Sequence, residues 1–409
     1  MINSYLKKHA YIEAQLKEHS DPELNMVIVI PARVEPDLRL TLESIYNADK
    51  PDRPFEIIIV FNHPEDENEE LKKLNEELFI QCKDWIYERK LSNCHLIKVF
   101  DLNKKHAGVG LARKIGMDEA VFRLGHNEEG IIVALDADCS VEANYLKCIE
   151  DRFTLDKKVN AASIYFEHQL SDKDEYLNEG IIQYELHLRY YNQLLRYAGH
   201  PFAYHTVGSS MAVRSRIYQQ QGGMNKRKAG EDFYFLQKVI QTGGFTEINS
   251  TCVYPSARVS DRVPFGTGRA QGEWLKEKSK ILFSYHPKAG LALKIFFSII
   301  ENTDERPIDT KSVPKSILLF IGKDILEDKL SELVENTASN SQFLLRFYKW
   351  FNLFMCFKFV HFYRDNVESN IPINNGAMLL LEILELDFAK NSSSLELLNL
   401  YRKLDKKTG

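Results

Sequence analysis

The chain contains short apolar runs that alternate with segments of helical periodicity, and this alternation constrains its fold more than any other feature. Four runs read as buried strands: MVIVIPA from residue 26, FEIIIVF from 55, CHLIKVF from 94 and GIIVALD from 130. Apolar residues at helical spacing lie between them, as in PDLRLTLESIYNA. Apolar strands that alternate with helices are typical of a parallel sheet covered on both faces. We therefore predict an α/β fold.

Beyond residue 159 the pattern is more mixed, and it indicates three regions. VNAASIYF and HTVGSSMAVR read as strands, whereas DEYLNEGIIQYELHLRYYNQLLRY and EDFYFLQKVIQTG read as helices. After about residue 285 strand signals stop. Residues 1–20 have Tyr5, Ile12 and Leu16 spaced for one helix face. We predict an N-terminal helix at 1–23, an α/β domain at 24–286 and a helical region at 287–409.

Composition excludes several classes of protein. The 409 residues carry a formal net charge of −5, which gives no reason to expect a nucleic-acid partner. Six cysteines are scattered without a C-x-x-C pair, which indicates reduced thiols and no zinc site. The N-terminus has no apolar core of signal-peptide type, and no stretch approaches the ~18 apolar residues of a membrane span. We expect a cytoplasmic protein.

Polar residues follow three of the predicted strands, in Pro31-Ala32-Arg33, Asn62-His63 and Asp136-Ala137-Asp138. Ligands of open α/β sheets bind at the carboxyl ends of the strands, so these residues should share one crevice. Two carboxylates at positions i and i+2 of an extended chain point the same way and repel each other. A hard divalent cation such as Mg²⁺ or Mn²⁺ would relieve that repulsion. The alternative is an ordinary acidic turn before a helix.

The motifs together resemble a known family. VIVIPARVEP is followed by FEIIIVFNHPED, HAGVGLARKIGMDEA and IIVALDADCSVEANYL, and then by HTVGSSMAVRSRIYQQQGGMN and GEDFYFLQKV. This ordered series, over residues 24–285, resembles the family 2 glycosyltransferases, which use nucleotide sugars. The resemblance implies the GT-A fold, a Rossmann-like mixed sheet flanked by helices, with the C-terminal helical region as an appendage. It also implies hexosyl transfer.

The same resemblance assigns roles to individual residues. Asp136 would face the ribose and the metal, and Asp138 would bind the Mn²⁺ or Mg²⁺ ion that holds the diphosphate. Asp232, beside Glu231 at the start of a helix, would be the catalytic base of an inverting reaction. The alternative for this acidic pair is a first helical turn favoured by the helix dipole. The implied nucleotide-sugar site consists of Pro31, Ala32, Arg33, Glu35, Asn62, Arg113, Asp136, Arg262 and Arg269.

Departures from the family pattern leave the donor open. Phe61 stands where the family usually has an aspartate that contacts the base, so a uridine donor is less favoured, and guanosine or another nucleotide stays open. Lys114 replaces a common asparagine and could face a phosphate or lie in solvent. RVSDRVPFGTGRAQGEW could form a loop in which Arg262 and Arg269 close over the diphosphate, or a plain surface loop. The Gln-x-x-Arg-Trp motif of processive synthases is absent, which favours one or few sugar additions.

Other functions compete with sugar transfer. A nucleotidyltransferase also uses acids at strand ends and Mg²⁺, but it would need a glycine-rich loop after the first strand, and PARVEPDLR has no glycine. A non-catalytic nucleotide-sugar-binding module is disfavoured by the presence of Asp136, Asp138 and Asp232. GVGLAR superficially matches a dinucleotide fingerprint but has Arg113 at the third glycine position.

The acceptor is open: a glycan, a lipid-linked molecule or a small molecule would fit. The segment FLLRFYKWFNLFMCFKFVHFYR, residues 343–364, is aromatic nearly all round and carries interspersed cations. A helix of this kind is normally buried in a core or a dimer contact. It could instead lie at the inner face of a membrane, which would suit a lipid-linked acceptor. A homodimer and a peripheral membrane contact through 343–364 are therefore expectations to be tested.

Overall fold

The computed structural model describes residues 3–171, 174–228, 230–260, 266–277, 279–302 and 310–407. Packing divides the chain into two compact units, each assembled from separate stretches of sequence. The first comprises residues 1–170, 206–269 and 405–409, and the second comprises residues 171–205 and 270–404. These units are defined by packing. The three regions predicted from the sequence, with boundaries at 23/24 and 286/287, stay a prediction.

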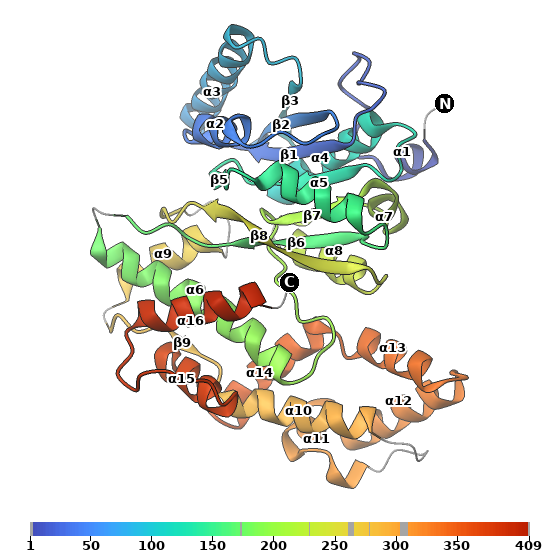
Figure 1. Ribbon diagram of the computed structural model, residues 1–409, viewed down its shortest axis with the longest axis vertical. Coiled ribbons are helices and arrows are strands. Elements are labelled where there is room, and N and C mark those ends of the chain that lie inside the picture. Colours follow the sequence, from blue (N-terminus) through green and yellow to red (C-terminus); the bar gives the residue numbers. More distant parts are fainter. Residues whose placement is uncertain are drawn as a thin grey trace. The chain divides into compact units, whose positions relative to one another are not determined.

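The first unit is built on an eight-stranded mixed sheet with the order β3-β2-β1-β4-β7-β6-β8-β5 (Figure 1). Its strands are β1 (Met26–Ala32), β2 (Phe55–Pro64), β3 (Cys94–Leu102), β4 (Ile131–Ala134), β5 (Cys139–Val141), β6 (Ala161–Phe166), β7 (Met211–Arg214) and β8 (Phe245–Pro255). β1 is parallel to β2 and β4, and β2 to β3, as the four apolar runs predict. β7 is antiparallel to β4 and β6, and β5 to β8, which makes the sheet mixed.

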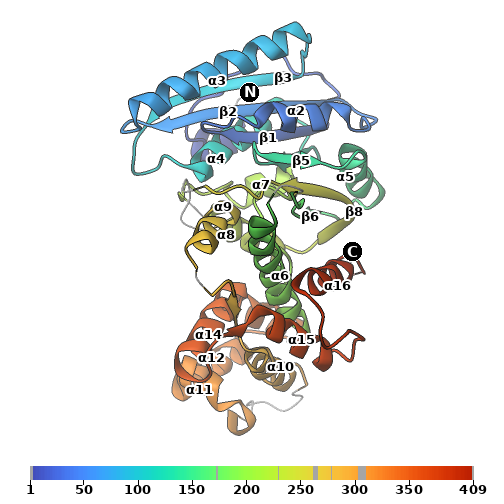
Figure 2. The same cartoon turned by 90° about the vertical axis from the view of Figure 1, so that its left-hand side faces the viewer.

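Helices connect the strands of this unit: α1 (Ser4–His9), α2 (Leu38–Asn47), α3 (Glu69–Glu88), α4 (Val109–Leu124), α5 (Tyr145–Leu155), α7 (Ser215–Gln220) and α8 (Glu231–Ile240). α4 packs along β1 and β2, and α3, in blue at the top of Figure 2, packs along β2. α4 lies so close to β1 that a Cβ on Gly116 would meet Val29 Cγ1 at 2.4 Å. The central helix that follows β3 is thus fixed against the sheet.

The N-terminal helix is shorter than predicted. α1 ends at His9, and residues 10–20 are not helical. The backbone N–H groups of Gln15 and Leu16 instead donate to the Glu119 carboxylate, at 2.8 and 3.1 Å. A backbone N–H that bonds a side chain on α4 cannot also form the i→i−4 bond of a helix. Docking against α4 therefore overrides the helical periodicity of this segment.

The second unit is almost entirely helical, in agreement with the predicted helical C-terminal region. It contains α6 (Glu175–Tyr197), α10 (Pro287–Glu301), a 3₁₀ turn (Thr310–Ser312), α11 (Lys315–Ile321), α12 (Lys323–Glu335), α13 (Asn340–Trp350), α14 (Leu353–Asn366), α15 (Ile373–Ile383) and most of α9 (Thr267–Lys276) and α16 (Ser394–Lys407). Its one described sheet is the pair β9 (Phe283–Ser284) and β10 (Ile371–Pro372). α6 packs against α10 and α15, and contributes Leu186, Tyr190 and Leu194 to the core.

The aromatic segment 343–364 forms two helices, α13 and α14, where the sequence predicts one. Asn352 begins α14, because its side-chain oxygen accepts the N–H groups of Phe354 and Met355 at 3.0 and 3.2 Å. Most of the apolar side chains of the segment are buried in the second unit, among them Phe347 and Phe359, while Leu345 and Phe357 are exposed. Burial in a core, the favoured interpretation, accounts for most of the aromatic residues. The membrane and dimer contacts remain predictions.

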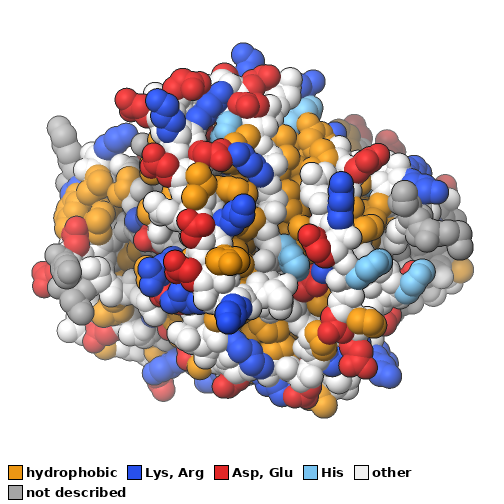
Figure 3. All heavy atoms as spheres, turned by 90° about the horizontal axis from the view of Figure 1, so that it is seen from above, with side chains coloured by type: hydrophobic (Ala, Val, Ile, Leu, Met, Phe, Trp, Pro, Cys, Tyr) orange, Lys and Arg blue, Asp and Glu red, His pale blue; other side chains and the backbone are white. Residues whose placement is uncertain are grey.

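On the face shown in Figure 3, Lys and Arg side chains are interspersed with Asp and Glu side chains. Over the described ranges, no helix is both long and apolar enough to cross a membrane.

Candidate active site

The predicted strand-end residues meet at one edge of the sheet. β2, β1 and β4 are adjacent and parallel, with Ala32 paired to Phe61 and Val29 to Ala134. The chain leaves all three strands on the same side, and Pro31 and Ala32 lie there with Asp136. The Asn62 amide joins two of the ends, because its Nδ2 donates to the Ala32 carbonyl at 3.0 Å. Register alone thus brings three predicted segments together.

Arg113 on α4 connects this edge to α8. The side chain is 3% exposed, and its Nη2 lies 2.6 Å from Asp136 Oδ1. Its Nη1 contacts the carboxylate of Glu231, the first residue of α8, which is also buried. One guanidinium therefore holds an acid from the end of β4 and an acid from the start of α8. Arg113, predicted to bind the nucleotide sugar, organises the acids of the site.

Asp232 lies beside the same arginine. A Cβ added to Gly208 would be 2.8 Å from Asp232 Oδ2 and 3.0 Å from Arg113 Nη1, so both side chains approach this glycine closely. The Phe233 N–H donates to Asp232 Oδ1 at 2.7 Å and fixes the carboxylate. Burial raises the pKa of Asp232, and the negative charge of Asp136 adds to the rise, while the positive charge of Arg113 opposes it. A positioned carboxylate with a raised pKa is suited to accept a proton.

The glycines of GVGLAR have a packing role. A Cβ on Gly110 would lie 2.2 Å from the Arg227 carbonyl oxygen and 2.9 Å from Glu231 Cγ. Only glycine lets the chain that leads into α8 lie directly against the first turn of α4. This approach brings Glu231 within reach of Arg113. The glycines are explained by this contact, without a dinucleotide.

Arg258, three residues after β8, is a residue of this edge that no sequence motif singles out. Its guanidinium contacts the Glu35 carboxylate, lies 3.0 Å from Asp37 Oδ2 and lies 3.5 Å from Asp138 Oδ2. It opens the RVSDRVPFGTGRAQGEW stretch, in which the candidates from the sequence are Arg262 and Arg269. Its partners lie at least 120 residues away in sequence, so no local pattern could point to it.

The remaining predicted residues are less central or lie outside the described residues. Arg33 forms an ion pair with Glu67, with Nε 2.7 Å from Oε2. Arg269 lies in the first turn of α9, and Arg262 falls outside the described residues. Lys114 does not lie in solvent: it is buried and its Nζ is 2.9 Å from Asp118 Oδ2. The solvent interpretation of Lys114 is wrong because the inward face of α4 contains its own acid one turn later.

The loop that follows β1 is held in a strained conformation. Val34 has φ +48°, which a β-branched residue rarely adopts. The buried Asn75 side chain on α3 accepts the Val34 N–H at 2.8 Å and donates to the Asn62 carbonyl at 3.2 Å. It therefore ties the loop carrying Arg33 and Glu35 to the end of β2. Strain that is held in place by such contacts is often found where a ligand binds.

The residues at this edge fit a divalent cation. Asp136 and Asp138 are 37% and 27% exposed, so oxygen atoms of both are accessible. Among the described residues, six carboxylates at this edge contact or adjoin the guanidinium groups of Arg113 and Arg258: Glu35, Asp37, Asp136, Asp138, Glu231 and Asp232. Carboxylate oxygens are the ligands that Mg²⁺ and Mn²⁺ prefer.

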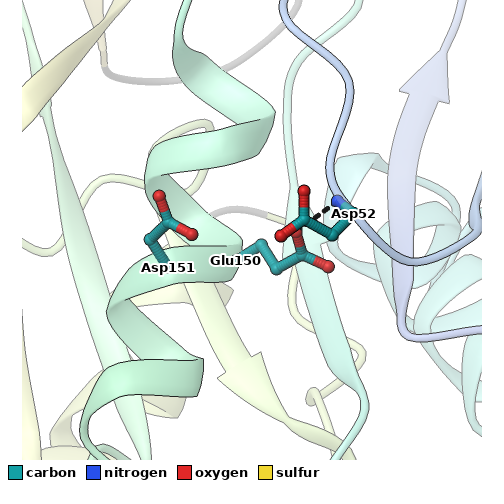
Figure 4. A group of neighbouring side chains, drawn as sticks. All are labelled: Asp52, Glu150 and Asp151. Carbon is teal, nitrogen blue, oxygen red and sulfur yellow. Dashed lines mark hydrogen bonds between the residues drawn. The ribbon is translucent and has the colours of Figure 1, made fainter.

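A second acidic group does not need an ion. Asp52, Glu150 and Asp151 offer carboxylate oxygens within 4.8 Å of one another (Figure 4), and they are the only such trio among the described residues. Lys147 Nζ lies 2.7 Å from Asp52 Oδ2 and 2.8 Å from Asp151 Oδ1. Glu150 also accepts the Arg53 N–H at 3.0 Å. The Lys147 ammonium group and the Arg53 backbone N–H therefore already bind the oxygens of these three carboxylates.

Comparison with known proteins finds a family match over part of the chain. Residues 27–221, which include Arg113, Asp136 and Asp138, match the glycosyl transferase family 2 profile. This region is a family 2 glycosyltransferase domain. The domain has the mixed α/β sheet of the GT-A fold, as the motif series predicts. No curated protein gives a significant match.

Solved structures similar to this glycosyltransferase are distant. S. aureus TarS residues 1–349 in complex with UDP-GlcNAc is 12% identical, with 89% of this chain and 93% of that chain covered and a TM-score of 0.40. The mannosyltransferase PcManGT from Pyrobaculum calidifontis, in complex with GDP-Man and Mn²⁺, is 14% identical, with the same coverage and a TM-score of 0.35. The assignment rests on the family match and the fold, and not on these likenesses.

The buried ion pair of Arg113 gives a first prediction. Arg113→Gln should destabilise the protein by about 3–5 kcal/mol, because it leaves the buried Glu231 carboxylate without its cation. Urea denaturation of the variant measures this loss. In the double variant Arg113→Gln/Glu231→Gln the uncompensated charge is gone, so most of the stability should return. A single variant as stable as the wild type would mean that the pair contributes nothing to folding.

Proposed function

We propose that this protein is a glycosyltransferase that catalyses metal-dependent, inverting transfer of a sugar from a nucleotide-diphosphate sugar to an acceptor hydroxyl group. The observation that carries the proposal is the position of Asp232. Its carboxylate lies beside Arg113, and Nη2 of that arginine contacts Asp136. Asp138 follows two residues later. A candidate base and a candidate metal ligand thus lie beside one buried guanidinium, which supports a single displacement at this site.

The donor side is assigned to the strand ends. Pro31, Ala32, Glu35 and Asn62, together with Arg33, would contact the base and the ribose, and the Asn75 tether keeps their loop in place. Asp136 and Asp138 would hold Mn²⁺ or Mg²⁺, which when bound stabilises the negative charge of the leaving diphosphate as a Lewis acid. Arg113 orients Asp136 and limits the repulsion between the acids around it.

The acceptor side is assigned to the start of α8. In an in-line displacement the attacking hydroxyl and the leaving diphosphate lie on opposite sides of the anomeric carbon. Asp232 would take the hydroxyl proton on its carboxylate as the new bond forms, and inversion of the anomeric centre follows from the single step. The raised pKa of Asp232 supports this role, because a base is more effective when its pKa approaches the working pH.

One assay separates this function from its alternatives. Hydrolysis of a panel of nucleotide sugars, each with Mn²⁺ and with Mg²⁺, should give free sugar and nucleoside diphosphate for at least one donor. A nucleotidyltransferase would instead release pyrophosphate from a nucleoside triphosphate in the presence of a sugar phosphate. A non-catalytic module would bind a nucleotide sugar without turnover, and either result would contradict the proposal. The acceptor, whether glycan, lipid-linked or small molecule, would then be sought with the active donor.

The pKa of Asp232 leads to a prediction about pH. The base works in its deprotonated form, so kcat/KM should fall as the pH drops through the pKa of Asp232. Because burial raises that pKa, this acidic limb should lie above pH 3.8, the ordinary value for an aspartate. The pH profile of kcat/KM for donor hydrolysis or transfer measures it. A profile that stays flat down to pH 4, with the protein folded, would contradict the assignment.

A further inference from the structure

Arg258 joins two parts of the proposed donor site. Its guanidinium contacts Glu35, from the loop after β1, and lies 3.5 Å from Asp138, from the turn after β4. Asp37 is a third acid on the same group, at 3.0 Å. Glu35 is 2% exposed, whereas the Arg258 and Asp138 side chains are each 27% exposed. The guanidinium therefore contacts a buried acid, Glu35, while it and Asp138 both stay partly exposed.

A metal ion at Asp138 would meet the positive charge of Arg258. Two cations on one carboxylate repel each other, and the repulsion is stronger beside a partly buried site than in bulk water. Binding of the metal alone should therefore be weakened by this arginine. A diphosphate reduces this repulsion, because it brings negative charge of its own. Its oxygens also match the planar, two-pronged donor geometry of a guanidinium.

We propose that Arg258 is a diphosphate-binding residue that exchanges partners: it leaves Asp138 when the metal enters and binds the phosphate oxygens of the donor. This inference rests on the proposed function, since it needs a metal and a nucleoside diphosphate at the same edge. The exchange needs only side-chain motion. The backbone on both sides is held, as the Arg258 N–H donates to Ser256 Oγ at 3.3 Å and the Ser260 N–H donates to the Gly268 carbonyl at 3.1 Å.

The exchange couples the metal to the diphosphate. With Arg258 present, the metal alone binds weakly and the metal with diphosphate binds well, because the second ligand takes over the guanidinium. Coupling of binding equilibria is reciprocal, so the diphosphate alone should also bind more weakly than it does with the metal. Arg258 would thereby favour entry of the donor as a metal complex.

The test compares Arg258→Gln with the wild type by calorimetry, with Mn²⁺ alone and with Mn²⁺ plus UDP or GDP. We expect opposite changes. Mn²⁺ alone should bind about two- to fivefold more tightly, the size of a partly exposed charge pair. Mn²⁺–nucleoside diphosphate should bind at least about tenfold more weakly, the size of a charge-assisted hydrogen bond. Arg39→Gln is the matched control, because Arg39 pairs with Glu43 on the exposed face of α2 and should change neither affinity.

A second variant guards against misfolding, since Arg258→Gln leaves the buried Glu35 without its cation. Arg258→Lys keeps the charge and loses the fork, so it should retain the wild-type affinity for Mn²⁺ alone and lose part of the diphosphate affinity. Unchanged diphosphate affinity in both variants, or equal weakening for Mn²⁺ with and without diphosphate, would overturn the role of Arg258. A wild type that binds no nucleoside diphosphate with any metal would overturn the proposed function itself, and this inference with it.

Discussion

Asp232→Asn should lower kcat by ~10²–10⁴-fold, the usual loss when a general base is removed. The asparagine keeps the shape of the side chain, so the close approach to Gly208 and the contact with the Phe233 N–H can persist. Donor affinity should change little, because the proposed function assigns Asp232 to the acceptor. A residue used only for binding would instead raise KM and spare kcat. Steady-state kinetics with the active donor and acceptor distinguish these results.

Glu231→Gln is the matched control for Asp232. Glu231 is buried and contacts Arg113, so we expect its replacement to act through stability and the position of Arg113. Its kcat should exceed that of Asp232→Asn. Glu231 could also substitute in part for a missing base, and the double variant would reveal this as a further loss. Near-normal kcat in Asp232→Asn, or NMR of the product with a retained anomeric configuration, would show that Asp232 is not the base of an inverting reaction.

Asp138→Asn should abolish Mn²⁺-dependent binding of a nucleoside diphosphate and leave the fold intact. Loss of a group that merely orients a metal ligand typically costs 10–100-fold in affinity, so loss of a ligand should exceed about 100-fold. The fold should survive because the Asp138 side chain is partly exposed and asparagine keeps its size. Titration calorimetry with Mn²⁺ and UDP or GDP measures the loss, and thermal unfolding checks the fold.

Asp151→Asn is the control for Asp138, because it also removes a partly exposed aspartate, from the acidic group that Lys147 compensates. We expect wild-type affinity in this variant. Unchanged metal-dependent affinity in Asp138→Asn would end the assignment of Asp138 as a metal ligand. Loss of binding in both variants would point to a general effect of charge on the protein, and not to a site.

The sequence predicted the parts of the site that depend on local pattern. Buried strands, here β1, β2 and β4, are recognisable because each is a short apolar run, and polar residues directly after such runs stand out. In a parallel sheet those residues must share one edge, which brings Ala32, Asn62 and Asp136 together without knowledge of side-chain positions. The order of the motifs also identified the family, because order along the chain is a property of the sequence alone.

Only the tertiary structure decided which charges meet. Arg113 contacts Glu231 across 118 residues of sequence, and Arg258 contacts Glu35 across 223, separations at which a sequence gives no distance. The same reason explains the errors: Gln15 and Leu16 leave the helical pattern for Glu119, and Lys114 turns inward to Asp118. Secondary structure follows from the periodicity of neighbouring residues. The pairing of charged side chains follows from how α4 packs against α8 and from the course of the chain after β8. Both arrangements exist only once the sheet has formed.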